Sequence, residues 1–290
     1  MKKLIIGCGY LGCRVADAWK TQGDEVWALT RSAERARTLA SAGIQPVIGD
    51  IMDVASLAAI GSISTPDVIL YAVARDRSSP ISMEELYLTG LRNVMSQFED
   101  FPSRWIYISS TSVYGQNQGE WVDEMSECRP ESDNGKICLQ GEQLFQQYVA
   151  NHPESRGHVL RLAGIYGPDR LIARLTGLIA GVPLQGRPDA WLNLIHVDDA
   201  VQAILAIERV DAAGEICLVA DDRPVQREEY YSLLSRLAGG PPPRFELASS
   251  GDSVEINKRC CNAMLRKRFQ VELLYPTIAE GLPHALSLPQ

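Results

Sequence analysis

The sequence predicts an α/β fold, in which a doubly wound parallel sheet is joined to a smaller C-terminal substrate lobe. Short apolar runs alternate with amphipathic helical segments from residue 4 to residue 162. Strands that alternate with helices form parallel sheets covered on both faces. A glycine-rich turn, Gly7-Cys8-Gly9-Tyr10-Leu11-Gly12, joins the first apolar run to the first helix. Such a turn between a strand and a helix is typical of the Rossmann unit that holds a dinucleotide.

The predicted elements follow one another in this order along the first half of the chain. The apolar runs predict strands at residues 4–6, 25–29, 45–48, 67–72, 104–109 and 158–162. The amphipathic segments predict helices at residues 14–22, 32–42, 53–60, 83–98 and 134–149, with Ser32 as an N-cap. Because the carboxyl ends of parallel strands share one edge of the sheet, residues after those ends should gather there.

After Gly164 the alternation loosens. Helices are predicted at residues 170–180, 197–208, 226–237 and 258–268, and strands at residues 191–196 and 215–220. We expect a dinucleotide-binding Rossmann domain made of residues 1–165 with 186–221. Residues 166–185 with 222–290 are expected to form the substrate-binding lobe.

The composition excludes several kinds of partner. The net charge of -8 and the pI near 5.1 leave no basic face for nucleic acid or an acidic membrane surface. No run of eighteen apolar residues predicts a membrane span. The seven cysteines are odd in number and form no C-x-x-C pair, which favours reduced thiols in a cytoplasmic protein. Four scattered histidines give little support to a metal site, and none is predicted.

The glycine turn predicts where the cofactor's phosphates bind. Gly7 permits a tight turn, Gly9 lets the pyrophosphate approach the backbone, and Gly12 lets the helix pack closely on the strand. The N-terminus of the helix that follows offers free N–H groups to phosphate oxygens, and Tyr10 and Leu11 of the turn belong to the same predicted cofactor-binding set. The alternative is a glycine turn that binds no ligand.

The end of the second strand predicts NADP as the cofactor, with NAD as the alternative. An acidic residue at this point binds the ribose 2′-hydroxyl of NAD, but Arg31 stands here. Its guanidinium suits the 2′-phosphate of NADP. Thr30 and Ser32 can add hydroxyl groups, and Arg35 a second phosphate contact. An exposed arginine before a helix is the competing interpretation.

Four stretches together resemble the extended short-chain dehydrogenases/reductases, in the NAD-dependent epimerase/dehydratase superfamily. They are Gly7 to Gly12, Tyr107 to Gly115, Leu160 to Pro168 and Ile195 to Ala200, in matching order and spacing. The resemblance implies that Asp50 faces the adenine amine and that Ile51 belongs to the same cofactor set. A turn or helix-capping aspartate is the alternative for Asp50. The small residues of Ala72-Val73-Ala74 would give room to the adenine and ribose.

The chain departs from that family in its glycine spacing and in its catalytic residues. Family members usually carry G-x-x-G-x-x-G, whereas this turn reads G-x-G-x-x-G. The family's catalytic tyrosine and lysine lie four residues apart on the helix at 134–149. Aligned on Gly141-Glu142, their positions hold Asn134 and Cys138. Ser110 occupies the position of the family's catalytic hydroxyl, with a strand-end cap as the alternative. Ser110, Asn134 and Cys138 are therefore the candidate catalytic residues of an atypical member.

The other polar residues of these motifs are predicted to be structural. We expect Arg161 to pair with an acid or to stack under the sheet edge. Tyr114 and Tyr166 are expected to pack in the interior, with a substitute proton donor as the alternative for either. Asp199 is expected to be an acid in the first turn of a helix, where the helix dipole favours it. His196 is interpreted as a structural residue of the His-Val-Asp-Asp motif.

Two classes of function remain open. One is an NADP-dependent oxidoreductase or epimerase acting on a small polar or nucleotide-sugar-like substrate, which Ser110 would orient. The other is a non-catalytic sensor or regulatory module that binds NADP. The missing tyrosine and lysine favour the second, because positioned proton transfer typically contributes roughly 10²–10⁴-fold to a rate. The retained Ser110 and the intact lobe favour the first. Family analogy leaves open a homodimer formed through the helices at 83–98 and 134–149.

Overall fold

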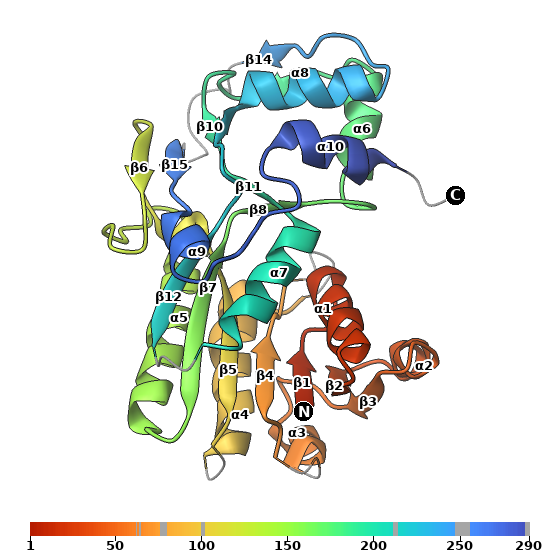
Figure 1. The fold of residues 1–290 in the computed structure, drawn as a ribbon, viewed down its shortest axis with the longest axis vertical. Helices are drawn as coiled ribbons and strands as arrows, with labels where there is room; N and C mark the ends of the chain where they lie inside the picture. The colour runs from red at the N-terminus through yellow and green to blue at the C-terminus, as the bar shows by residue number, and fades with distance from the viewer. Residues whose placement is uncertain are drawn as a thin grey trace. The chain divides into compact units, whose positions relative to one another are not determined.

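The computed structural model describes residues 1–61, 63, 65–75, 80–99, 102–210, 214–246 and 256–287. A central sheet contains β1 (Lys2–Ile6), β2 (Glu25–Thr30), β3 (Gln45–Ile48), β4 (Val68–Tyr71), β5 (Arg104–Ser110), β7 (Arg156–Leu162) and β12 (Glu215–Val219). Their order is β12-β7-β5-β4-β1-β2-β3. The pairings of β1 with β2 and β4, of β2 with β3 and of β4 with β5 are parallel (Figure 1). The doubly wound parallel sheet is therefore confirmed.

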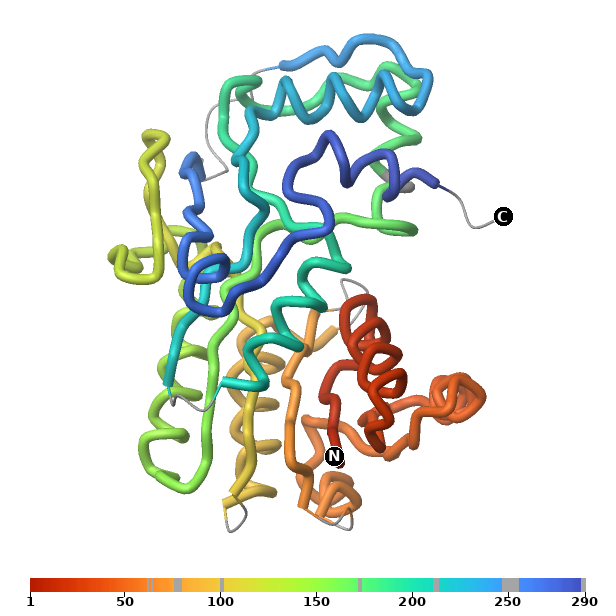
Figure 2. Tube along the Cα trace, in the orientation of Figure 1, coloured from red at the N-terminus to blue at the C-terminus, as the bar shows by residue number. Residues whose placement is uncertain are grey.

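Helices connect these strands as the alternating pattern predicts. They are α1 (Tyr10–Thr21), α2 (Ala33–Ser41), α3 (Val54–Gly61), α4 (Gly90–Met95) and α5 (Asp133–Asn151). Figure 2 follows the chain from β1 through α1, β2 and α2 to β3 in red and orange. Ser32 caps α2 as expected, because its side chain accepts a hydrogen bond from the backbone N–H of Arg35. The segment before β5 is less regular than one helix, with a π-helical turn at Glu85–Thr89 and a 3-10 turn at Ser96–Phe98.

The chain divides into two compact units. The first contains Met1–Val113, Asp133–Arg161 and Ile204–Cys217, and the second Tyr114–Ser132, Leu162–Ala203 and Leu218–Gln290. The helix α7 (Val197–Ile207) begins in the second unit and ends in the first. The bounds differ from those expected for the Rossmann domain, since residues 114–132, 162–165, 186–203 and 218–221 lie in the second unit. The reason is strand pairing: β6 (Glu120–Val122) pairs with β15 (Lys258–Cys260), and β8 (Gly164–Tyr166) pairs with β11 (Leu194–His196).

The second unit also shows which predicted elements were wrong. Its remaining elements are α6 (Ile172–Ile179), β9 (Leu184–Gln185), β10 (Trp191–Leu192), β13 (Val225–Gln226), α8 (Arg227–Leu237), β14 (Phe245–Glu246), α9 (Ala263–Lys267) and α10 (Ile278–Leu286). The helix predicted at residues 258–268 starts only at Ala263, because β15 takes the first residues. The strand predicted at residues 191–196 is broken at Asn193, whose side chain hydrogen-bonds the backbone of Lys258 and Cys260.

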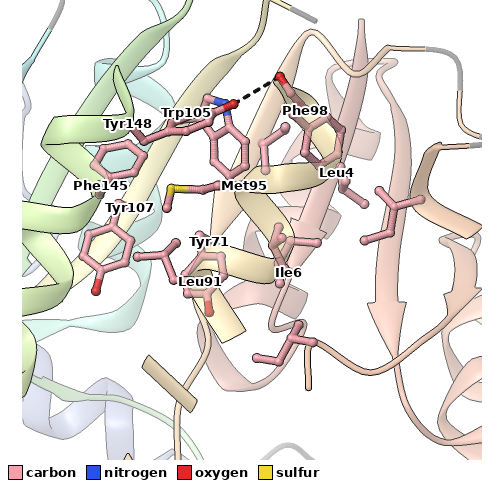
Figure 3. Packing of buried hydrophobic residues seen from close by; sticks show 14 of the residues in the cluster. Leu4, Ile6, Tyr71, Leu91, Met95, Phe98, Trp105, Tyr107, Phe145 and Tyr148 are labelled. Carbon is pink, nitrogen blue, oxygen red and sulfur yellow. Dashed lines mark hydrogen bonds between the residues drawn. The ribbon is translucent and has the colours of Figure 1, made fainter. Parts of the chain in front are cut away.

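A hydrophobic core lies between one face of the sheet and the helices α4 and α5 (Figure 3). Alternate residues of a strand point to opposite faces, so Leu4 and Ile6 of β1 reach this core together. Their neighbours are aromatic or long apolar side chains, which are Tyr71, Leu91, Met95, Phe98, Trp105, Tyr107, Phe145 and Tyr148. The hydroxyl of Tyr148 donates to the carbonyl of Phe98 at 3.1 Å, so this buried polar group is satisfied.

A buried ion pair ties α5 to the sheet. Arg161 of β7 contacts the carboxylate of Glu142 on α5, with Nη2 at 2.7 Å from Oε2 and Nε at 3.1 Å from Oε1. The hydroxyl of Ser109, on β5, donates to the same carboxylate at 2.6 Å. Glu142 is 1% exposed and Arg161 3% exposed. The expectation that Arg161 pairs with an acid is therefore confirmed.

We predict that Arg161→Met lowers the free energy of unfolding by about 3 kcal/mol, because it leaves a buried carboxylate without its cation. The matched control is Arg187→Met, since Arg187 makes a similar forked contact with Asp189 on the exposed surface. Urea unfolding followed by circular dichroism measures both variants. Equal midpoints for Arg161→Met and the wild type would contradict a stabilising role for the buried pair.

Candidate functional site

The glycine turn lies where the order of the strands reverses. From β1 the sheet continues to β2 and β3 on one side and to β4 and β5 on the other. Ile6, the last residue of β1, is in register with Leu29 of β2 and Tyr71 of β4. Gly7 and Ala72 therefore follow adjacent strand ends. Ligands of open α/β sheets bind outside the carboxyl ends of the strands at such a reversal.

Two of the three glycines are required by close backbone contacts. Gly7 has a φ of 97°, a conformation that favours glycine, and a Cβ there would lie 2.5 Å from the carbonyl oxygen of Ala72. A Cβ on Gly12 would lie 2.6 Å from the carbonyl oxygen of Gly7 and 3.2 Å from a side-chain carbon of Ile5. The turn can therefore lie against β4, and α1 against β1, only with glycine at these positions.

Gly9 differs from the other two because it faces open space. Apart from Gly9 itself and its two chain neighbours, no heavy atom of the described chain lies within 4 Å of the position that its Cβ would occupy. Gly9 is also the N-cap of α1, where no side chain caps the helix and no acid stands in the first turn. The first turn of α1 starts at Tyr10 and Leu11. Its backbone N–H groups therefore lie next to open space that no side chain caps. These features fit the pyrophosphate of a dinucleotide.

Basic residues follow β2, and one of them reaches the glycine turn. Arg31 is exposed, and the Nη2 of Arg35 donates to the carbonyl of Cys8 at 3.1 Å. The hydroxyl groups of Thr30 and Ser32 make hydrogen bonds within this segment. The hydroxyl oxygen of Thr30 accepts from the N–H of Ser32 at 3.3 Å, and the hydroxyl oxygen of Ser32 caps α2. Both hydroxyls keep a proton to donate. No acidic residue stands at the end of β2.

The predicted adenosine-side residues lie at the ends of the neighbouring strands. Asp50 follows β3, and its Oδ1 accepts from the N–H of Met52 at 2.9 Å, which is the geometry of a turn aspartate. Ile51 is buried. After β4, the N–H of Ala72 donates to the carbonyl of Ile6 at 2.8 Å. Val73 is half-buried like Ala72, whereas Ala74 is exposed.

The three candidate catalytic residues differ in their surroundings. Ser110 ends β5, and its hydroxyl oxygen accepts from the N–H of Ser112 at 3.1 Å, which caps a 3-10 turn. Asn134 is exposed in the first turn of α5. Cys138, one turn later, is 5% exposed, and burial raises the pKa of its thiol, an effect that the nearby Ser112 hydroxyl partly offsets. Asn134 and Cys138 share a helix face, but only Cys138 lies against the strand-end turn.

Sequence reasoning missed Cys8 and Cys13 as residues of this region. It grouped them with the other reduced thiols, yet both are half-buried and their sulfur atoms lie 3.6 Å apart beside the glycine turn. Arg35 also donates to the sulfur of Cys13, at 2.9 Å. The signal in the sequence was their position on either side of Gly9 and the first turn of the helix.

A histidine pair in the second unit was also unexpected, since its members are 88 residues apart. The Nε2 of His196 lies 3.2 Å from the Nδ1 of His284, and Asp198 stands close enough for the three to hold a metal ion. The Nδ1 of His196 accepts from the N–H of Asp198 at 3.2 Å, so Nε2 can donate to His284. This hydrogen bonding accounts for the cluster without an ion. His196 is fully buried against Tyr166, as expected of packing residues.

The comparisons with known proteins agree with this geometry. The family model described as "NAD dependent epimerase/dehydratase family" matches residues 4–220, which is well over half of the chain. The chain belongs to this family. This match confirms the resemblance that the four sequence motifs indicated. Within its described residues, no helix combines the length and the apolar character needed to cross a bilayer.

Three relatives illustrate the range of the family. Protein YeeZ of Escherichia coli K12 is 28% identical over 272 residues, which cover 91% of this chain and 94% of YeeZ. A 3-diazoavenalumate denitrifying reductase of Streptomyces is 28% identical and covers 84% of each chain. The solved structure of a putative NAD-dependent epimerase/dehydratase from Methylobacillus flagellatus is 32% identical, with a TM-score of 0.79 over 99% of this chain and 97% of that one.

We predict that Gly9→Val abolishes dinucleotide binding, because the side chain would fill the open space over the helix N-terminus. Each charge-assisted hydrogen bond to the pyrophosphate would contribute about 1.5–3 kcal/mol to the binding free energy. Losing these bonds should therefore weaken binding at least about a hundredfold. Gly61→Val is the control, since a Cβ on Gly61 also meets no atom within 4 Å. Calorimetric titration with NADPH measures both variants. Unchanged affinity in Gly9→Val would show that the phosphates bind elsewhere.

Proposed function

We propose that this chain is an NADP-dependent oxidoreductase or epimerase that acts on a small polar substrate, such as a nucleotide sugar. One observation carries the proposal. The glycine turn at the reversal of strand order leaves open space over Gly9, while Arg31 stands at the end of β2, where an enzyme for NAD needs an acid, and Arg35 reaches the glycine turn from the first turn of α2. The family is described as NAD dependent, which supports the binding of a dinucleotide but does not distinguish NADP from NAD.

The residues of the first unit would hold this cofactor in three places. The N–H groups at the start of α1 would bind the pyrophosphate over Gly9. Arg31 and Arg35 would pair with the 2′-phosphate, which needs a cation at the end of β2. Ala72, Val73 and Ala74 would line the adenosine pocket, with Oδ2 of Asp50 to accept from the adenine amine. When bound, the nicotinamide supplies hydride transfer.

Ser110 would orient the substrate. Its oxygen already accepts the N–H of Ser112, so its proton can be donated to a carbonyl or hydroxyl oxygen of the substrate. Cys138 stays protonated at neutral pH, because burial raises its pKa. Asn134 can hydrogen-bond but cannot exchange a proton. The proton that accompanies hydride transfer would therefore pass through water or through the substrate itself.

A second candidate function is an NADP-binding sensor or regulatory module without turnover. The alignment that puts Asn134 and the buried thiol of Cys138 at the positions of the family's tyrosine and lysine favours it. No Tyr-x-x-x-Lys sequence occurs anywhere in the chain. The two candidates share one cofactor site and differ only in whether a substrate is converted.

The wider setting is also a proposal. We place the protein in the cytoplasm, where its seven free cysteines would stay reduced. A small molecule is the proposed partner, and nucleic acid is not, because the net charge is -8. By analogy with the family, a homodimer would form through α4 and α5.

We predict that Arg31→Gln weakens NADPH binding by about ten- to a hundredfold and leaves NADH binding nearly unchanged, because only NADPH carries the 2′-phosphate. Arg37→Gln, which removes an exposed charge from α2, the helix that follows Arg31, should leave both affinities unchanged. Fluorescence titrations with the two cofactors give the ratio. Equal losses for NADPH and NADH would overturn the assignment of Arg31.

We predict that Ser110→Ala lowers kcat on a confirmed substrate by about a hundredfold, as expected when one positioned donor is removed. NADPH affinity should stay the same, and Ser41→Ala on the surface of α2 should leave kcat unchanged. Full turnover in Ser110→Ala would remove Ser110 from the catalytic machinery.

The double variant Asn134→Tyr with Cys138→Lys separates the two candidate functions. If the native protein converts no substrate and the double variant does, the native chain is the binding module.

A further inference from the structure

Two thiols flank the phosphate-binding turn. Cys8 lies between Gly7 and Gly9, and Cys13 lies at the end of the first turn of α1. Their sulfur atoms are 3.6 Å apart, and the sulfur of Cys13 lies 3.3 Å from the carbonyl oxygen of Cys8. Both residues are half-buried, so small oxidants can reach them. Glycine on both sides of Cys8 gives this segment backbone freedom that other residues lack.

The charges around the pair give the two thiols different roles. The hydrogen bond from Cys8 and the guanidinium of Arg35, whose Nη2 is 2.9 Å from Sγ, lower the pKa of Cys13 to about 6. Burial and the carboxylate of Asp17 oppose this effect. The same hydrogen bond, with burial, raises the pKa of Cys8. Near neutral pH, Cys13 is thus the thiolate and Cys8 the protonated thiol, which is the division between an attacking and a resolving cysteine.

We propose that Cys13 is a site of oxidation by hydroperoxides, and that Cys8 resolves the product into a disulfide across the phosphate-binding turn. The thiolate of Cys13 attacks the terminal oxygen of the hydroperoxide, and the O–O bond breaks. Cys13 becomes a sulfenic acid, and the alkoxide or hydroxide that leaves takes a proton from solvent. The sulfur of Cys8 then attacks that of Cys13 and gives up its proton. The S–O bond breaks, and water leaves. Two electrons pass from the thiols to the peroxide.

The disulfide would change the cofactor site, a consequence that rests on the proposed function. Bringing the sulfurs from 3.6 Å to about 2.05 Å requires the turn around Gly9 to move. The thiolate that Arg35 contacts is also lost. We therefore expect the oxidised protein to bind NADPH less tightly, and bound NADPH to slow the oxidation by covering the turn.

The test uses the full chain treated with hydrogen peroxide and then digested with trypsin. Cleavage after Lys3 and Arg14 puts both thiols on one peptide, residues 4–14. We expect this peptide to lose two hydrogen atoms before the half-buried Cys128 and Cys261 react, and to regain them with dithiothreitol. In Cys8→Ser, dimedone should trap a sulfenic acid on Cys13, while Cys261→Ser should behave like the wild type. A peptide that stays reduced while Cys128 or Cys261 is oxidised would overturn the proposal.

Two rate measurements test the role of the environment. Arg35→Gln should slow the oxidation of Cys13 by about tenfold, because the thiolate loses its cation, whereas Arg37→Gln should have no effect. Because a lowered pKa leaves Cys13 ionised throughout, its rate should change little between about pH 7 and pH 9. A rate that rises about tenfold per pH unit over this range would contradict a preformed thiolate.

NADPH titrations of the reduced and oxidised protein separate this proposal from the proposed function. Weaker binding only after oxidation, reversed by dithiothreitol, supports both. A disulfide that forms without changing NADPH affinity would contradict the effect on the cofactor site. Failure of the reduced protein to bind any dinucleotide would contradict the proposed function, while the peptide result would still decide whether the thiols react.

Discussion

The close approach of Gly7 to the backbone of Ala72 is the constraint on which the candidate site depends. A side chain at Gly7 would lie 2.5 Å from the carbonyl oxygen of Ala72, so the turn after β1 can lie against the end of β4 only with glycine. Gly12 makes a similar demand between α1 and β1. Together these contacts bring the start of α1 to the reversal of strand order and leave the space over Gly9 open.

The fold of the first unit could be predicted because its elements follow local rules. The strand at Gln45–Ile48 has the predicted bounds, and Ser32 caps its helix as predicted. The second unit was harder because its strands depend on distant partners. The segment at Lys258–Cys260 looked helical but pairs with β6, more than a hundred residues earlier. The helix α10, which contains Pro283, was missed although the Thr277–Glu280 capping box marks its start.

The candidate site was predictable to a similar degree. The spacing of the glycines and the absence of an acid after β2 could be read from the sequence, but the contact between Arg35 and Cys13 could not. It joins residues 22 positions apart on α2 and α1, and depends on how these helices pack. Asn134 and Cys138 are proposed to stand where the family carries its catalytic tyrosine and lysine, and neither side chain of this pair would serve as a proton donor at neutral pH. Cofactor binding and turnover are therefore separable properties of this chain.

We propose that the turn at Gly9 and the arginines after β2 form one site for a dinucleotide with a 2′-phosphate. Calorimetric titration of the reduced protein with 2′-phospho-ADP-ribose and with ADP-ribose tests it most directly, because these compounds lack the nicotinamide and differ by one phosphate. We expect 2′-phospho-ADP-ribose to bind at least about tenfold more tightly than ADP-ribose, because one charge-assisted contact contributes about that much to affinity. Equal affinities, or no binding of either compound, would contradict it.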